Sequence, residues 1–221
     1  MKTLFAVCAC SVLALSAGPA RPQEPVRSDQ AARNVAVGTC AICHGPGGNS
    51  VVPTFPKLAG QREGYLIVQL KAFRSQSRGD PDAMAYMWGM AAPLSDEVIA
   101  ALARYYASQK PAPGTAGDPA IVARGREIYE KGVASQNIRA CRACHEANTE
   151  SSADSPRLAG QHAEYIIKQM YSFRNESRNV AVMHGVAKDM KLVEMEAVAA
   201  YLQSKVAGSV FFDSTGHAST Y

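Results

Sequence analysis

Apolar residues recur at helical spacing along most of the chain, with no convincing strand-like alternation. Tyr65 and Phe73, for example, are apolar positions of one predicted helix at 61–76. Comparable patterns predict helices at 96–108, 121–131, 162–175 and 193–204. The pattern therefore predicts an all-α fold.

Several helix starts are marked by short polar residues, whose side chains accept hydrogen bonds from the free N–H groups of a first turn. Ser28 and Asp29 are predicted to cap a helix in the first half, and Ser95 the helix at 96–108. Asp118 precedes Pro119, and proline is favoured at the first helical position. A new helix is therefore expected to begin directly after residue 118.

The chain contains an internal repeat. Pro56, Lys57 and the Leu-Ala-Gly-Gln that follows them are matched 100 residues later by Pro156, Arg157 and a second Leu-Ala-Gly-Gln. Nearer the end of each half, the two copies match at an offset of 96. We expect two tandem helical domains at 21–110 and 119–206. Residues 111–118, rich in Pro, Gly and small residues, form the linker, and residues 207–221 form a tail that is either disordered or docks on a partner.

The first residues resemble a secretory signal peptide. Lys2 precedes an apolar run at 4–17, which Pro19 ends. We expect residues 1–20 to be removed on export, which leaves a soluble protein in the periplasm. An uncleaved N-terminal anchor is the alternative.

Composition adds two constraints. The 221 residues are 47% hydrophobic, but each half is small for a self-sufficient core, so a large buried cofactor would help it to fold. The net charge is only +4 and no basic run is clustered, so nothing indicates nucleic-acid binding.

Two cysteine motifs indicate that cofactor. Cys40, Cys43 and His44 form one C-x-x-C-H sequence, and Cys141, Cys144 and His145 form the second, 101 residues later. This pattern is typical of covalent haem c attachment, with the histidine bound to the iron. A redox dithiol is one alternative. A zinc site is another, and it requires both cysteine pairs to converge on one metal.

The remaining axial position is expected to be a methionine, because His/Met ligation suits electron transfer. The candidates are Met84, Met87, Met90, Met170, Met183, Met190 and Met195. At the offset of 96, only Met87 and Met183 are methionine in both halves, which makes them the predicted ligands. His184 would compete in the second domain, but its counterpart is Trp88. His162 is expected to be a solvated surface residue.

Pro56 and Pro156 could each supply a carbonyl that accepts the second ring N–H of the proximal histidine. The alternative is that both are simple turn prolines. The sequence by itself does not separate these interpretations.

Taken together, these motifs resemble those of the cytochrome c4 family, the di-haem class I c-type cytochromes of bacterial periplasms. The resemblance covers roughly residues 28–206. It implies a small helical cytochrome fold in each domain, with the two domains related by pseudo-two-fold symmetry. It also implies His/Met-ligated iron, and carbonyls of Pro56 and Pro156 on His44 and His145. The second domain departs from the pattern, since it lacks the Gly-rich run after its motif and the Ser cap of the last helix.

The resemblance also implies a function. Family members relay electrons between a membrane cytochrome bc complex and haem-copper terminal oxidases, often loosely associated with the membrane. The chain is therefore expected to be an electron carrier rather than an enzyme. The main alternative is a di-haem electron-accepting subunit of a sulfide, thiosulfate or alcohol dehydrogenase. A di-haem peroxidase is a further alternative, which would need a displaceable sixth ligand.

Overall fold

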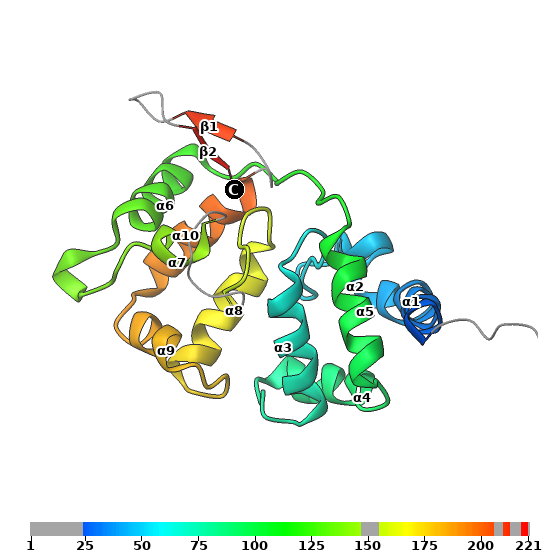
Figure 1. Cartoon of the computed structure of the whole chain (residues 1–221). Coiled ribbons are helices and arrows are strands. Elements are labelled where there is room, and N and C mark those ends of the chain that lie inside the picture. The colour runs from blue at the N-terminus through cyan, green and yellow to red at the C-terminus, as the bar shows by residue number, and fades with distance from the viewer. Residues whose placement is uncertain (1–23, 147–154, 206–209, 213–217, 221) are drawn as a thin grey trace, which may run out of the picture.

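The computed structural model describes residues 24–146, 155–205, 210–212 and 218–220. The predicted signal peptide, 1–20, lies outside the described residues. Figure 1 shows two groups of helices joined by an extended linker. No helix in the described part of the chain combines the length and apolar character needed to cross a membrane.

The first domain is built from helices and short helical turns. In order, they are α1 (Glu24–Val35), η1 (Ala36–Cys40), α2 (Ala41–His44), η2 (Pro46–Gly48), α3 (Glu63–Arg74), η3 (Ala83–Met87), α4 (Trp88–Ala91) and α5 (Asp96–Ala107). The predicted Ser95 cap is confirmed, because its side chain accepts from the backbone N–H of Val98. The predicted cap at Ser28 and Asp29 is wrong, since α1 begins at Glu24. Asp29 instead pairs with Arg104 of α5, with 2.8 Å between Oδ1 and the guanidinium nitrogen.

The second domain repeats this plan with fewer turns. Its elements are α6 (Pro119–Lys131), η4 (Ala134–Gln136), α7 (Arg142–His145), α8 (Ala163–Arg174), α9 (Ala181–Ala187) and α10 (Leu192–Ser204). Asp118 caps α6 by accepting from the backbone N–H groups of Ala120 and Ile121. Two short strands follow, β1 (Val210–Phe212) and β2 (Ala218–Thr220), paired antiparallel. The sequence pattern missed these strands, because three residues are too few to show an alternation.

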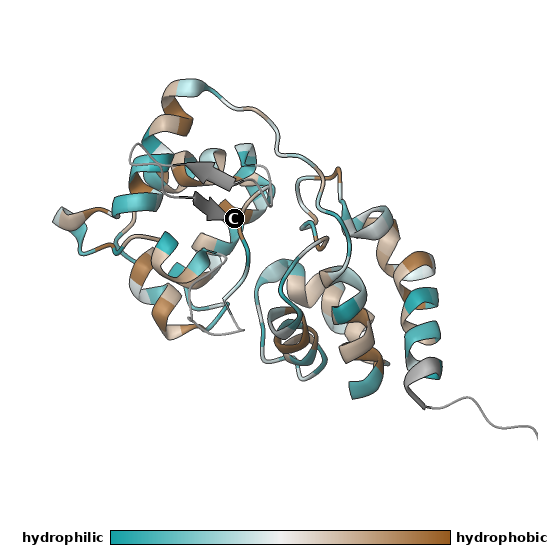
Figure 2. Ribbon diagram, turned by 45° about the horizontal axis from the view of Figure 1, so that its top comes forward, coloured by the Kyte–Doolittle hydropathy of each residue, from teal (hydrophilic) through white to brown (hydrophobic). Residues whose placement is uncertain are grey.

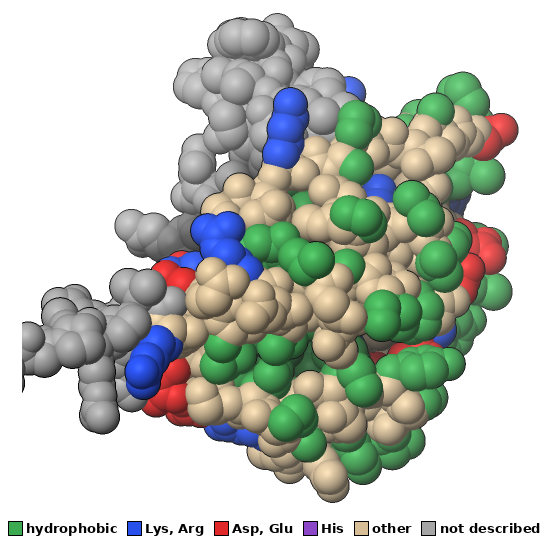
Figure 3. Space-filling model, turned by 90° about the vertical axis from the view of Figure 1, so that its right-hand side faces the viewer, with side chains coloured by type: hydrophobic (Ala, Val, Ile, Leu, Met, Phe, Trp, Pro, Cys, Tyr) green, Lys and Arg blue, Asp and Glu red, His purple; other side chains and the backbone are tan. Residues whose placement is uncertain are grey.

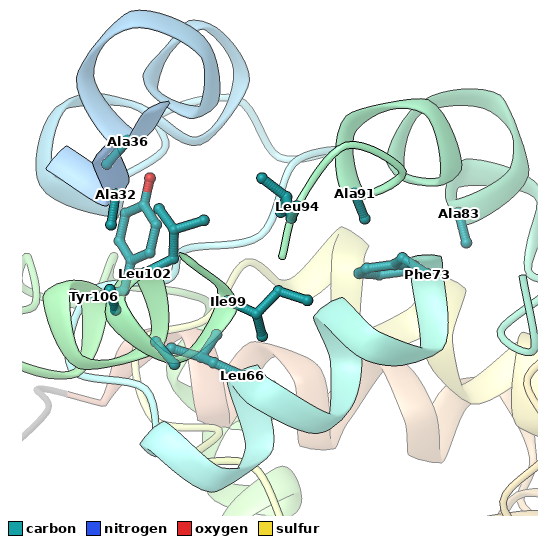
Figure 4. Close-up of a cluster of buried hydrophobic side chains, with 12 residues drawn as sticks. Ala32, Ala36, Leu66, Phe73, Ala83, Ala91, Leu94, Ile99, Leu102 and Tyr106 are labelled. Atoms are coloured by element: carbon teal, nitrogen blue, oxygen red, sulfur yellow. The ribbon is translucent and has the colours of Figure 1, made fainter. Parts of the chain in front are cut away.

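Each domain has its own hydrophobic core. In the first, α5 packs against α1 and α3, and Figure 4 shows Ile99, Leu102 and Tyr106 of α5 facing Leu66 of α3 and Ala32 of α1. A buried Leu or Ile stabilises the fold by about 1.5–3 kcal/mol. Figure 2 shows apolar and polar residues interspersed along the helices.

In the second domain, α10 packs against α6 and α8. Gly125 of α6 permits the closest approach, because a β-carbon there would collide with the carbonyl oxygen of Ala197 in α10. Around this contact lie buried core residues that include Tyr129, Met195 and Leu202. The α6–α10 pair is thus the counterpart of the α1–α5 pair in the first domain.

The two domains meet through α3 and α8, which lie side by side in Figure 1. Arg78 donates to Gln169 Oε1 at 2.8 Å, and Arg178 donates to Gln69 Oε1 at 3.0 Å. These paired contacts involve residues exactly one repeat of 100 apart. The domains are therefore related by a pseudo-two-fold axis, as the resemblance implies.

Candidate haem-binding sites

The first cysteine motif lies on a single helical turn. Cys40 ends η1, and Cys43 and His44 belong to α2, so the two thiols are neighbours three positions apart. The turn stops at Gly45, which has a φ of 73°. A β-carbon at Gly45 would lie 2.6 Å from the carbonyl oxygen of Asn49, so only glycine lets the chain fold back here.

The His44 ring is buried and held in one orientation. Its Nδ1 donates to the carbonyl oxygen of Pro56 at 2.8 Å, which leaves Nε2 as the unprotonated ring nitrogen. Burial lowers the pKa of His44 below its ordinary value, and the bond to Pro56 opposes this shift only in part. Phe55 contacts the ring edge-on, with 6.3 Å between centroids. His44 therefore presents a neutral imidazole, the form that binds a metal.

The second motif is also helical, and its histidine is held in the same way. Cys141 precedes α7, which contains Cys144 and His145. Nδ1 of His145 donates to the carbonyl oxygen of Pro156 at 2.9 Å. Burial again lowers the pKa of the histidine, and the positive charge of Arg62, from the other domain, lowers it further. Both motifs therefore offer an oriented Nε2 beside two thiols.

None of the four motif cysteines is paired in a disulfide, so all four sulfur atoms are available for thioether links. Burial raises the pKa of the Cys40 thiol, and that of the Cys141 thiol to about 11. The described residues contain no cluster of three or more His, Cys, Asp or Glu that could hold a metal ion, so the two pairs do not converge on a zinc site. Two thiols and one imidazole in each domain are the set that a covalently attached haem requires.

Each predicted axial methionine lies in the helical segment that follows the long helix α3 or α8. Met87 ends η3 and packs half-buried against the first core, and Met183 is half-buried in α9. Other candidates in the second domain have a packing role, since Met190 and Met195 are 2% and 1% exposed in its core. Thioether side chains fill irregular core space well.

Both competing histidines have other partners. His184 Nδ1 lies 3.0 Å from the carbonyl oxygen of Phe173, and its Nε2 lies 3.4 Å from the carboxylate of Glu176. The prediction that His162 is a solvated surface residue is wrong. It is only 8% exposed, and its Nε2 donates to the carbonyl oxygen of Ser50 in the first domain at 2.9 Å. Its burial comes from the opposite domain, which a local pattern does not reveal.

Exposed apolar side chains lie within the first motif and shortly after it. Ile42 is 80% exposed, and Val51 and Val52 lie between the motif and Pro56 with 89% and 45% exposure. Hydrophobic side chains are also spread over the first-domain face drawn in Figure 3. A large, mostly apolar ligand suits such surroundings better than a small ion does.

The fold and these two sites define a c-type cytochrome with two haem-binding domains. The cytochrome c family profile matches residues 30–110 and again residues 122–205. Cytochrome c-552 from Acidithiobacillus ferridurans is 40% identical over 167 residues, which span 75% of this chain and 73% of that protein. Cytochrome c4 from Azotobacter vinelandii is 38% identical over 186 residues, with 79% and 88% covered.

The thiosulfate dehydrogenase electron acceptor from Thiomonas intermedia is 36% identical over 176 residues, covering 76% of this chain and 78% of that protein. The solved structure of cytochrome c4 from Acidithiobacillus ferrooxidans superimposes with a TM-score of 0.69 at 40% identity, over 75% of this chain and 98% of that one. The chain belongs to the cytochrome c4 family. It carries two covalently bound haem c groups and is an electron-transfer protein rather than an enzyme.

Proposed function

We propose that the protein shuttles single electrons in the periplasm, between a membrane cytochrome bc complex and a haem-copper terminal oxidase. The haem irons supply the one-electron chemistry by changing between Fe(II) and Fe(III). His44 and Met87 are the proposed axial ligands in the first domain, and His145 and Met183 in the second. Cys40, Cys43, Cys141 and Cys144 form the thioether links. Residues 1–20 direct export.

The observation that carries this proposal is the matched fixation of the two histidines. In each domain a proline carbonyl holds Nδ1, at 2.8 Å for His44 and 2.9 Å for His145. Each imidazole therefore keeps one orientation whichever oxidation state the metal has. Little rearrangement accompanies electron transfer, which suits a carrier.

The test is an optical comparison of the purified oxidised protein with the variants Met87→His and Met183→His. We expect the weak sulfur-to-iron charge-transfer band near the red edge, at the intensity of two haems, and loss of half that intensity in each variant. A haem that lacks the band, or that binds cyanide or peroxide readily, would show that its methionine is not a ligand. An enzymatic role would then be favoured for that domain.

A second candidate function is supported by one specific similarity. The relative from Thiomonas intermedia is an electron acceptor of thiosulfate dehydrogenase. By that likeness, this chain would accept electrons from the catalytic subunit of a dehydrogenase as a bound partner. Stable co-purification with a catalytic chain would favour this role, whereas weak, salt-sensitive binding to the oxidase would favour the mobile carrier.

A further inference from the structure

The peptide group after Pro56 is hydrogen-bonded at both ends. Its carbonyl oxygen accepts from Nδ1 of His44 at 2.8 Å, and its N–H, which belongs to Lys57, donates to Oε1 of Gln161 at 2.9 Å. The Gln161 amide also donates through Nε2 to the carbonyl oxygen of Lys57, again at 2.9 Å. Gln161 is 7% exposed and belongs to the second domain. Thus one buried side chain of the second domain clamps the peptide that orients the histidine of the first.

The mirror arrangement occurs at the second site. Nδ1 of His145 donates to the carbonyl oxygen of Pro156 at 2.9 Å, and the N–H of Arg157 donates to Oε1 of Gln61 at 2.7 Å. Nε2 of Gln61 completes the pair by donating to the carbonyl oxygen of Arg157 at 2.9 Å. Gln61 is 5% exposed and belongs to the first domain. Each domain therefore holds the histidine-orienting peptide of the other.

Lys57 and Arg157 also hold the backbone beside these paired glutamine hydrogen bonds, which we call the two clamps. Lys57 Nζ donates to the carbonyl oxygen of Gly160 at 3.0 Å, and Arg157 Nε donates to that of Gly60 at 2.9 Å. The two glycines directly precede Gln161 and Gln61. The backbone that carries each glutamine is thereby tied to the residue that the glutamine clamps.

Hydrogen bonds at the two ends of one peptide group strengthen each other. When the N–H donates, the amide polarises and its carbonyl oxygen becomes a better acceptor, by roughly 10–30% per bond. A better acceptor draws the Nδ1 proton outward and makes the imidazole a more electron-donating ligand. Burial enlarges the effect, because little water screens it.

We propose that Gln61 and Gln161 are positioning residues that couple each proximal histidine to the opposite domain, so that domain docking tunes both haems. The proposal rests on the proposed ligand roles of His44 and His145. Gln161 acts on the haem of the first domain and Gln61 on that of the second. A stronger bond to the histidine favours the ferric state, so loss of either glutamine raises the reduction potential of the opposite haem. We expect the reduction equilibrium constant to change by about two- to fivefold, which is about 20–40 mV at 59 mV per decade.

The test reads one haem at a time. In a Met183→His background, the charge-transfer band reports only the haem of the first domain, and its loss during a redox titration gives that potential. There we expect Gln161→Leu to raise the potential and Gln61→Leu to leave it unchanged. In a Met87→His background the outcome is reversed. Gln161→Glu keeps an acceptor for the Lys57 N–H. In the Met183→His background it should therefore leave the reduction potential of the first haem equal to or below that of the protein with Gln161.

Tyr65→Phe is the matched control. It removes a different cross-domain bond, from Arg178 to the Tyr65 hydroxyl at 2.8 Å, and leaves both clamps in place. We expect neither potential to move. Equal shifts of both haems, or a shift confined to the haem of the altered domain, would overturn the proposal. If the Met183→His protein lacks the band, it is the assignment of Met87 as a ligand that fails. The glutamine variants are then made with both methionines intact, and the effect of each glutamine on the opposite haem is read from the two one-electron steps of the redox titration.

Discussion

The two domains support their methionine segments differently. In the first, the Trp88 side chain follows Met87 and donates its indole N–H to the carbonyl oxygen of Arg78 at 2.8 Å. In the second, His184 follows Met183, and its ring bonds the carbonyl oxygen of Phe173 at 3.0 Å while remaining one-third exposed. The proline-to-histidine bonds, by contrast, agree to within 0.1 Å. The duplicated copies have kept the histidine geometry and diverged in what surrounds it.

A second difference lies at the interface between the domains. Arg78 and Arg178 are equivalent and both are buried, with 7% and 6% exposure. Arg78 pairs with the buried carboxylate of Asp80 at 2.6 Å. The position equivalent to Asp80 is Val180. The buried carboxylate beside this arginine pair therefore comes from the first domain, and this asymmetry predicts unequal effects of equivalent substitutions.

The largest expected effect follows from removing that carboxylate. Asp80→Asn would leave Arg78 buried without its carboxylate, and breaking a buried pair costs about 3–5 kcal/mol. We expect a loss of about 3 kcal/mol in the free energy of unfolding, because the amide oxygen still accepts one bond. The measurement is denaturant unfolding of the haem-loaded protein, followed by the fluorescence of Trp88, the single tryptophan.

The matched control is Asp29→Asn, which breaks an exposed pair with Arg104. Exposed pairs contribute roughly 0–1 kcal/mol. A comparable loss in both variants would show that burial does not set the strength of the Asp80 pair.

The last helices of the domains give the next comparison. Ser95 caps α5, whereas in α10 Glu194 reaches back to the backbone N–H of Lys191 at 2.8 Å and also accepts from Gln136 at 2.6 Å. Glu194 is only 4% exposed. Glu194→Ala leaves two donors unsatisfied, so we expect a loss of about 2–3 kcal/mol.

Ser95→Ala should cost about 1 kcal/mol, the usual value for a cap. Thermal unfolding of both variants tests the difference. Equal losses would mean that the buried carboxylate of Glu194 contributes no more than a simple cap does.

The helices and their caps could be predicted because they depend on local sequence. Predicted helices such as 96–108 and 162–175 agree with α5 and α8 to within one residue at each end. The role of Asp29 could not be found, because its pairing with Arg104 is a tertiary contact. The same reason explains His162, whose partner Ser50 lies 112 positions away.

The candidate sites divide in the same way. C-x-x-C-H is a local signature, and the repeat reduced seven methionines to Met87 and Met183. Gln61 and Gln161 were visible as repeated residues, but nothing local links them to His145 or His44. Their role depends on hydrogen bonds between the two domains, and these bonds cannot be predicted from the sequence of a single repeat.

A smaller loss of stability is expected when the side chains that follow the methionines, Trp88 and His184, are replaced. Trp88→Phe removes the indole N–H and leaves the Arg78 carbonyl without this donor, at a cost of about 1–2 kcal/mol. We expect the methionine band of the first haem to disappear at lower denaturant concentration in the Met183→His background. His184→Phe, tested in the Met87→His background, should have less effect, because its partly exposed site admits water. A larger shift for His184→Phe would reverse this ranking.

The smallest effect concerns pH and the equivalent pair Arg62 and His162. Burial lowers the pKa of His162 below 6.5 and the charge of Lys57 adds to this, while the Ser50 carbonyl and the Glu164 carboxylate oppose it. As pH falls through 6.5, the unfolded chain therefore binds the proton first, so stability present at neutral pH is progressively lost. His162→Gln removes that loss and keeps a donor for the Ser50 carbonyl. Arg62→Gln is the comparison at the equivalent position. The Arg62 charge acts on His145 and not on His162, so this variant should keep the acid loss that His162 causes. Unfolding free energies at about pH 7.5 and about pH 5.5 measure both, and identical acid losses in the unaltered protein and His162→Gln would contradict the prediction.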